Sequence, residues 1–208
     1  MKGVLQYQFG GLRDAWHDGL KEEFKRSAMA FCVLAVLAFG VSLALPDLRD
    51  RAVALILDTM SGTGAVREDG TLSAPGIFSN NLRACVFTMV YGLLPFLQLP
   101  ALALGVNALL LGVLAAWYVS EGLSLLAYLA ALLPHGILEL PALLLAFAMG
   151  LYVCGHLTRR CRKDENALHV WDCLVLISRM LLLVLIPLLA AAALVEAYIT
   201  PAVASLFL

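Results

Sequence analysis

The sequence predicts an all-α fold that crosses a membrane about five times, and two observations carry this prediction. Of the 208 residues, 62% are hydrophobic and 14% are charged, whereas soluble domains are roughly half apolar and about a quarter charged. Over residues 84–158, only Glu121 and Glu139 carry a formal charge, and about 20 apolar residues suffice for one helix to cross a bilayer. We therefore expect a polytopic helical membrane protein rather than a water-soluble enzyme.

Charge, cysteine spacing and motifs indicate which partners and cofactors to expect. The formal net charge of -1 provides no basic field for a nucleic acid, so none is predicted as a partner. The five cysteines form no C-x-x-C pair, which argues against a disulfide framework and a zinc finger. We expect no cofactor. The expected partners are membrane lipid, membrane or envelope proteins, and a second copy of the chain.

Residues 1–26 are predicted to form a cytoplasmic amphipathic segment ahead of the first hydrophobic run. Over residues 4–26, apolar side chains recur at intervals of three and four opposite a charged face, which indicates a helix. These side chains are Leu5, Phe9, Leu12, Trp16, Leu20 and Phe24. Such a helix lies in the membrane interface, or it packs against a partner or against its own chain.

Residues 27–208 are predicted to form a single transmembrane domain. Its first crossing is the uncharged run Ala28–Leu45, which at 1.5 Å per residue is ~27 Å long. Residues 47–79 then carry mixed charges and a part rich in Gly, Ser, Thr and Pro. We expect an external loop there, with turns at Ser61–Gly64 and Pro75–Gly76.

The next apolar run contains two prolines five residues apart, Pro95 and Pro100. A proline inside a helix removes one hydrogen bond and clashes with the preceding turn. The run is therefore expected to form two helices, at about 79–97 and 101–119, joined by a turn.

The following apolar run, Leu123–Leu133, is too short to cross a bilayer alone, since 11 residues reach only ~17 Å. It leads directly into Pro134-His135-Gly136 and a second apolar stretch. The sequence therefore predicts a broken or re-entrant helix near 123–141. The residues assigned to this structural helix break are Pro134, Gly136 and Pro141.

Lysines and arginines in short flanking segments set the expected orientation. Five precede the first crossing, and four cluster at Arg159, Arg160, Arg162 and Lys163, so both regions are predicted to be cytoplasmic. A last crossing at about 171–197 then places the C-terminus outside the cell. The expected location is the inner (plasma) membrane.

Polar residues inside the apolar region form the candidate site. His135 and Glu139 are four apart and share one helix face, and a carboxylate at membrane depth is costly unless neutral, paired or hydrated. The pair indicates a structural helix break, a proton relay, an ion or substrate site, or two of three metal ligands. Arg179 either extends to the cytoplasmic surface or reaches inward to Glu139. The predicted site residues are His135, Glu139, Asn80, Asn81, Asn107, Arg179 and Glu196.

Metal binding and catalysis have weaker support in the sequence. His135-x3-Glu139 is not the H-E-x-x-H motif. Zinc needs at least three protein ligands, for which only the distant His156, His169 and Glu196 remain. No metal ligand and no catalytic residue are therefore predicted.

Three blocks of the sequence resemble the stage II sporulation protein M family. They are Phe78–Leu82, Leu133–Ala142 and Glu196–Pro201, and the Pro-His-Gly-x-x-Glu-x-Pro pattern in the second is the most specific. The chain departs from the family pattern at Asn107-Ala108, where Asn-Gly is expected. The resemblance implies a bacterial or archaeal inner-membrane protein of about five spans without established catalysis. The family's namesake is linked to engulfment of the forespore beside peptidoglycan-degrading partners, and members also occur in organisms that form no spores.

The first functional hypothesis is a non-enzymatic scaffold or partner of envelope and cell-wall remodelling machinery, which would use the amphipathic segment and loop 47–79 as interaction surfaces. The alternative is a transporter or channel-like protein with an intramembrane His/Glu site for a cation, a proton or a small substrate. An intramembrane metal-dependent enzyme is the third hypothesis and has the least support.

Overall fold

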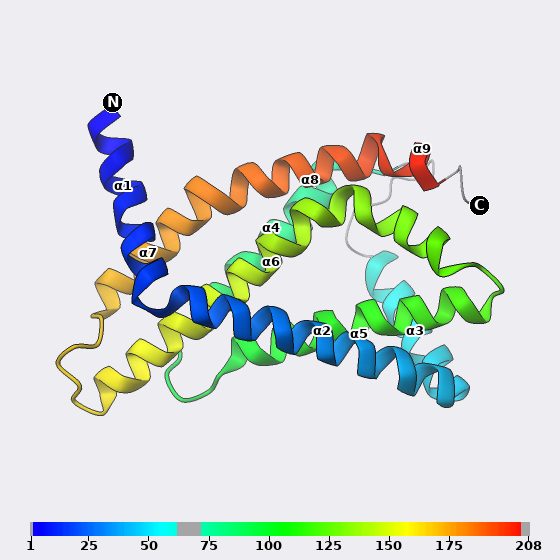
Figure 1. Ribbon diagram of the computed structural model, residues 1–208, viewed down its shortest axis with the longest axis horizontal. Helices are drawn as coiled ribbons and strands as arrows, with labels where there is room; N and C mark the ends of the chain where they lie inside the picture. Colours follow the sequence, from blue (N-terminus) through cyan, green and yellow to red (C-terminus); the bar gives the residue numbers. More distant parts are fainter. Residues whose placement is uncertain (1, 62–71, 205–208) are drawn as a thin grey trace. The chain divides into compact units, whose positions relative to one another are not determined.

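The computed structural model describes residues 2–61 and 72–204, and its regular elements in these ranges are helices (Figure 1). This confirms the predicted all-α fold. The helices are α1 (Lys2–Ala15), α2 (Lys21–Ala44), α3 (Pro46–Ser61), α4 (Ala74–Tyr91), α5 (Leu99–Ser120), α6 (Leu125–Cys161), α7 (Val170–Met180), α8 (Ile186–Tyr198) and α9 (Thr200–Ala204), with wider π-helical turns at η1 (Trp16–Leu20) and η2 (Leu181–Leu185).

Several helices are long and apolar enough to cross a membrane, as the composition predicts. Among the described residues there are four such stretches: Gln6–Ala44, Leu99–Ser120, Leu132–Cys161 and Val170–Tyr198. The chain is thus a multi-pass helical membrane protein. α4 is not among the four, so the predicted crossing at 79–97 stays a prediction.

The described chain folds into two compact units, each made from three separate stretches. Unit 1 consists of Met1–Met29, Leu82–Leu104 and Ala142–Leu188, and unit 2 consists of Ala30–Asn81, Gly105–Pro141 and Leu189–Leu208.

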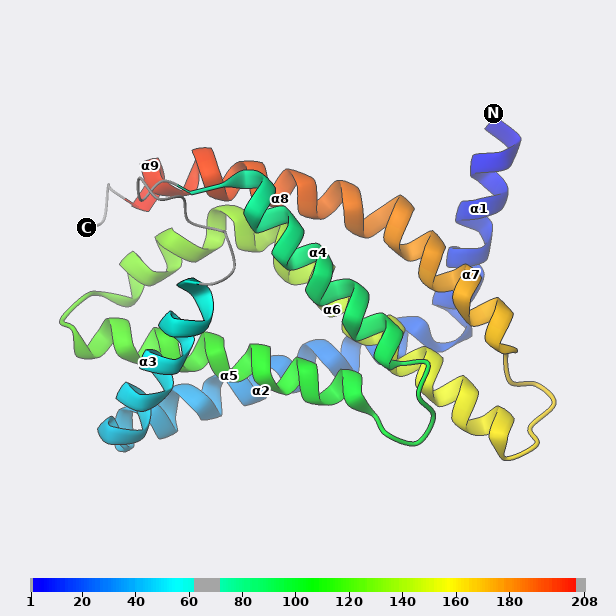
Figure 2. The same ribbon diagram turned by 180° about the vertical axis from the view of Figure 1, so that it is seen from behind.

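In unit 1 the predicted amphipathic helix is bent between α1 and α2 (Figures 1 and 2). Gly19 has a φ of 132° within η1, and the Lys21 amide donates to the carbonyl of Trp16, five residues back. α1 packs against α7. Leu12 and Leu20 of the predicted apolar stripe are buried, whereas Phe9 is exposed. Part of the stripe therefore packs within its own chain.

Gly19→Ala is expected to lower the free energy of unfolding by about 1–3 kcal/mol, because a φ of 132° is a conformation that residues with a Cβ rarely adopt. The cause would be the backbone, since an added Cβ meets only Tyr152 Cε2, at 3.7 Å. Gly40→Ala is the matched control, because a Cβ at helical Gly40 meets nothing within 4 Å. Thermal unfolding in detergent compares the two variants, and equal midpoints would contradict the prediction.

Backbones approach each other closely in unit 1 around Gly150 of α6. A Cβ built there would lie 2.8 Å from the Thr88 carbonyl oxygen of α4 and 2.8 Å from Pro100 Cγ. A Cβ on Gly92 would in turn collide with the Gly150 carbonyl group. Small residues commonly permit such contacts between membrane helices, so Gly150 is required for this packing.

A polar network joins η1 to α6 within unit 1. The Tyr152 hydroxyl donates to Asp18 Oδ2 at 3.1 Å, and the tyrosine ring packs on the His156 ring with centroids 4.4 Å apart. His156 Nδ1 accepts from the Leu168 amide at 3.2 Å and lies 2.9 Å from Arg159 Nη2. The bend after α1 is therefore held by specific side-chain contacts.

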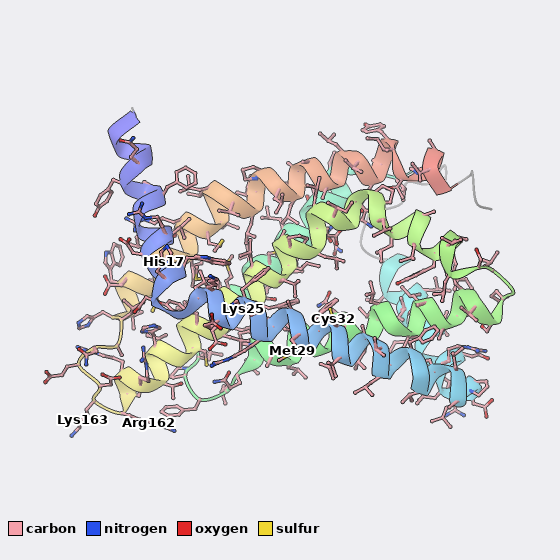
Figure 3. The ribbon with its side chains drawn as sticks, viewed as in Figure 1. His17, Lys25, Met29, Cys32, Arg162 and Lys163 are labelled. Carbon is pink, nitrogen blue, oxygen red and sulfur yellow. The ribbon has the colours of Figure 1, made fainter. Side chains whose placement is uncertain are left out.

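The basic group predicted to be cytoplasmic lies at the end of α6 and in the turn after it, where Figure 3 shows Arg162 and Lys163. Lys163 has a left-handed φ of 67°, and the Asp164 amide donates to the Arg159 carbonyl at 3.1 Å. This geometry is a common way to end a helix.

In unit 2 the predicted loop 47–79 is partly helical. α3 begins at Pro46 and has Asp47 in its first turn, both favourable at a helix N-terminus. The predicted turn at Pro75–Gly76 is wrong, because these residues form the start of α4, with Ser73 Oγ accepting the Gly76 amide at 3.3 Å. The turn at Ser61–Gly64 lies outside the described residues beyond Ser61.

The predicted helix break near 123–141 takes the form of a bend. α6 is one helix of 37 residues with Pro134 and Pro141 inside it, and its ribbon changes direction sharply in its first half (Figures 1 and 2). An interior proline removes one backbone donor and clashes with the preceding turn, which bends a helix without necessarily ending it. Re-entry of this segment into the membrane stays a prediction.

Gly136→Ala is expected to be tolerated and to raise the unfolding free energy by up to about 1 kcal/mol, since alanine favours a helix interior over glycine. An added Cβ meets Leu132 Cγ at 3.6 Å and Leu140 Cδ1 at 3.8 Å, which are ordinary contacts. The unfolding midpoint in detergent tests this. A lower midpoint would show that Gly136 has a structural role which these contacts do not explain.

Candidate functional site

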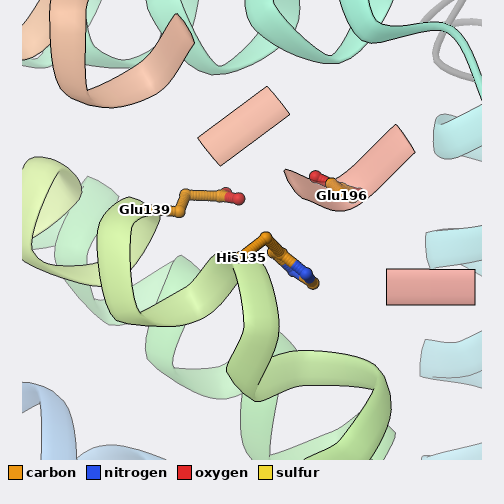
Figure 4. Close-up of side chains that lie close together, drawn as sticks. All are labelled: His135, Glu139 and Glu196. Atoms are coloured by element: carbon orange, nitrogen blue, oxygen red, sulfur yellow. The ribbon is translucent and has the colours of Figure 1, made fainter. Parts of the chain in front are cut away.

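Unit 2 brings three of the predicted site residues together. The ligating atoms of His135, Glu139 and Glu196 all lie within 4.8 Å of one another (Figure 4). His135 and Glu139 come from successive turns of α6, and Glu196 comes from α8. All three side chains are half-buried.

Two further side chains hold this cluster in place. Asn81 of α4 makes a side-chain hydrogen bond to Glu139. His135 Nδ1 lies 3.2 Å from Thr200 Oγ1, and the same hydroxyl donates to the Val195 carbonyl at 3.3 Å. Because the hydroxyl has a single proton, the neutral tautomer of His135 that fits both contacts carries its proton on Nδ1 and leaves the lone pair on Nε2.

Thr200 is the site residue that the sequence analysis missed. It is buried at the start of α9. The available signal was its position four residues after Glu196, a spacing that places two side chains on one helix face.

The cluster contains two carboxylates beside the imidazole of His135. Ion pairs in the described part of the chain include Lys25–Glu22, Arg26–Glu23, Arg49–Asp50 and Arg159–Asp164, and none of these four includes Glu139 or Glu196. Charged carboxylates in apolar surroundings require compensation, so this arrangement favours the binding of a proton or a cation.

The other predicted site residues occupy different environments. Asn80 is exposed beside Asn81, and Asn107 is half-buried in the part of α5 that belongs to unit 2. Arg179 belongs to unit 1, where its Nε donates to Gln8 Oε1 at 2.7 Å and its guanidinium lies 5.3 Å from the centre of the Tyr7 ring.

Glu196 lies near one end of its candidate span. It precedes the end of Val170–Tyr198 by two residues, or about 3 Å. Glu139 lies inside α6, 14 residues after the start of that helix at Leu125.

The helices and this cluster define a multi-pass α-helical membrane protein with a polar group inside its apolar spans. A family model described as Stage II sporulation protein M matches residues 27–201. The chain belongs to the stage II sporulation protein M family, which confirms the resemblance of its sequence blocks. No curated protein and no solved structure matches the chain.

Proposed function

We propose that this protein binds a cation at the cluster of His135, Glu139 and Glu196 and conducts it across the membrane. The observation that carries the proposal is the convergence of three ligating side chains from α6 and α8 in an otherwise apolar region. Intramembrane ionisable residues commonly mark ion or proton pathways.

The chemistry of the cluster supports reversible binding. Two carboxylates attract a cation, so the occupied cluster is favoured over the charged empty one. Asn81 and Thr200 supply hydrogen bonds that orient Glu139 and His135 without adding charge.

Flux into proteoliposomes tests this proposal. The full chain is reconstituted, and uptake of protons and of metal cations is followed with dyes enclosed in the vesicles. Glu139→Gln is expected to reduce flux at least about tenfold, because it removes one charge from the site and keeps its shape. Glu121→Gln makes the same chemical change at an exposed position in unit 2 and is expected to leave flux unchanged. Equal flux in both variants, or no flux in the wild type, would contradict the proposal.

A second candidate function is a non-enzymatic scaffold for envelope machinery, supported by exposed leucines on α3. Leu48, Leu55 and Leu57 are 55%, 68% and 53% exposed, on a helix outside the four candidate spans. Exposed apolar side chains on a helix are common at protein or membrane contacts. This surface falls within the predicted external loop.

Replacement of these three leucines by serine tests the scaffold function. Envelope proteins that co-purify with the full chain from host membranes are expected to be lost in the triple variant. Arg51→Gln, an exposed change on the same helix, is expected to retain them. Co-purification that survives both the triple substitution and removal of residues 1–26 would remove both proposed interaction surfaces.

A further inference from the structure

We infer that the cluster of His135, Glu139 and Glu196 is a site for a divalent transition-metal ion with the donor preference of zinc. The inference rests on the proposed function, because it names the class of cation that the same site takes. It goes further by specifying the charge of the ion, its ligands and the residues that orient them.

The distances permit a common centre. Three atoms no more than 4.8 Å apart always have a point within about 2.8 Å of each, and zinc bonds to nitrogen and oxygen are about 2.0–2.2 Å long. Each of the three atoms that meet this limit, one His135 nitrogen and one oxygen of each carboxylate, would therefore have to move inward by less than about 1 Å.

The donor set selects the type of metal. An imidazole nitrogen suits zinc and the first-row transition metals, whereas sodium, magnesium and calcium prefer oxygen ligands alone. The net charge of the ligands also favours a divalent metal ion. A divalent ion neutralises both Glu139 and Glu196 beside a neutral His135, whereas a monovalent ion leaves one uncompensated negative charge.

The surrounding contacts are those that metal sites commonly have. Histidine ligands usually donate their second ring N–H to an oxygen, which fixes the tautomer and the ring orientation. Here His135 Nδ1 lies 3.2 Å from Thr200 Oγ1, and that hydroxyl donates its proton to the Val195 carbonyl. The tautomer with its proton on Nδ1 fits both contacts and leaves Nε2 as the metal ligand. Asn81 hydrogen-bonds the Glu139 carboxylate.

Metal titration of the full chain in detergent tests the inference. Co²⁺ serves as a probe because its visible absorption reports its ligands, and Zn²⁺ binding is measured by calorimetry with Mg²⁺ in excess. We expect one ion per chain that Mg²⁺ does not displace. Glu139→Gln and Glu196→Gln are expected to weaken binding by about 100-fold or more, and Thr200→Val by about tenfold. Glu121→Gln is the matched control and is expected to bind as the wild type does.

X-ray absorption of the zinc-loaded wild type gives an answer even if a variant fails to fold. The expected spectrum contains one imidazole and oxygen ligands at about 2.0–2.2 Å. A spectrum without imidazole, absence of stoichiometric binding, or equal affinity in Glu139→Gln and Glu121→Gln would overturn the inference.

The two proposals fail in distinguishable ways. Stoichiometric zinc binding without flux would support the metal site and contradict the transport function. Proton flux that depends on Glu139, with no binding of zinc or cobalt, would support the transport function and contradict the metal site.

Discussion

Gly150→Ala is expected to lower the free energy of unfolding by about 3 kcal/mol, at the upper end of ordinary overpacking costs. The added methyl group would lie 2.8 Å from the Thr88 carbonyl oxygen and 2.8 Å from Pro100 Cγ. Neither the backbone carbonyl nor the proline ring is the end of a flexible side chain, so relief requires movement of helix backbones.

Gly155→Ala on the same helix is the control for Gly150→Ala. A Cβ there meets nothing within 4 Å, and alanine is favoured over glycine in a helix by about 0.8–1 kcal/mol. The two variants are thus expected to shift the thermal midpoint in opposite directions. Equal midpoints would show that the contact around Gly150 does not limit stability.

Glu139→Gln is expected to stabilise the metal-free protein while it abolishes stabilisation by zinc. Carboxylate oxygens of Glu139 and Glu196 lie within 4.8 Å of each other, and two unit charges at that limit repel by about 3 kcal/mol at an effective dielectric constant of about 20. Gln removes this repulsion from Glu196 and retains an oxygen for Asn81. At pH 8, where carboxyl groups are ordinarily ionised, the gain in unfolding free energy is therefore expected to reach about 2–3 kcal/mol.

Thermal unfolding of the wild type and of Glu139→Gln, each with a chelator and with zinc, measures this effect. The unfolding midpoint of the wild type is expected to rise when zinc is added. The variant is expected to have a higher midpoint than the wild type in chelator, and zinc is expected to leave that midpoint unchanged. A variant that is less stable than the wild type in chelator would show that other groups already compensate the negative charge of Glu139.

The helical fold was predictable because charge is scarce and the apolar runs are long, but local bends were not. Gly19 separates α1 from α2, although the apolar spacing continues from Trp16 to Phe24 and indicates one helix. Conversely, Pro134 and Pro141 predict a break, and α6 bends but continues through both. Local patterns identify residues that interrupt helices, whereas tertiary packing decides whether the interruption occurs.

Most residues of the cluster were candidates in the sequence, whereas their contacts were not predictable. The four-residue spacing predicted that His135 and Glu139 share a helix face, and that pair forms one side of the cluster. Asn81 and Glu196 were candidates as polar residues in or beside apolar runs, but Glu196 and Thr200 lie about 60 residues further along the chain, and no periodicity reports which helices meet. Their contact with α6 required a three-dimensional structure.

The position of Glu196 near the end of its span has an electrical consequence. About 3 Å separate Glu196 from the end of Val170–Tyr198, roughly a tenth of the hydrocarbon thickness of a bilayer. Moving one charge across a full membrane at 100 mV involves about 2.3 kcal/mol, so a divalent ion that reaches Glu196 from this side would experience about 0.5 kcal/mol. Its exit to the far side would experience about 4 kcal/mol. The membrane voltage would therefore act mainly on release and much less on binding.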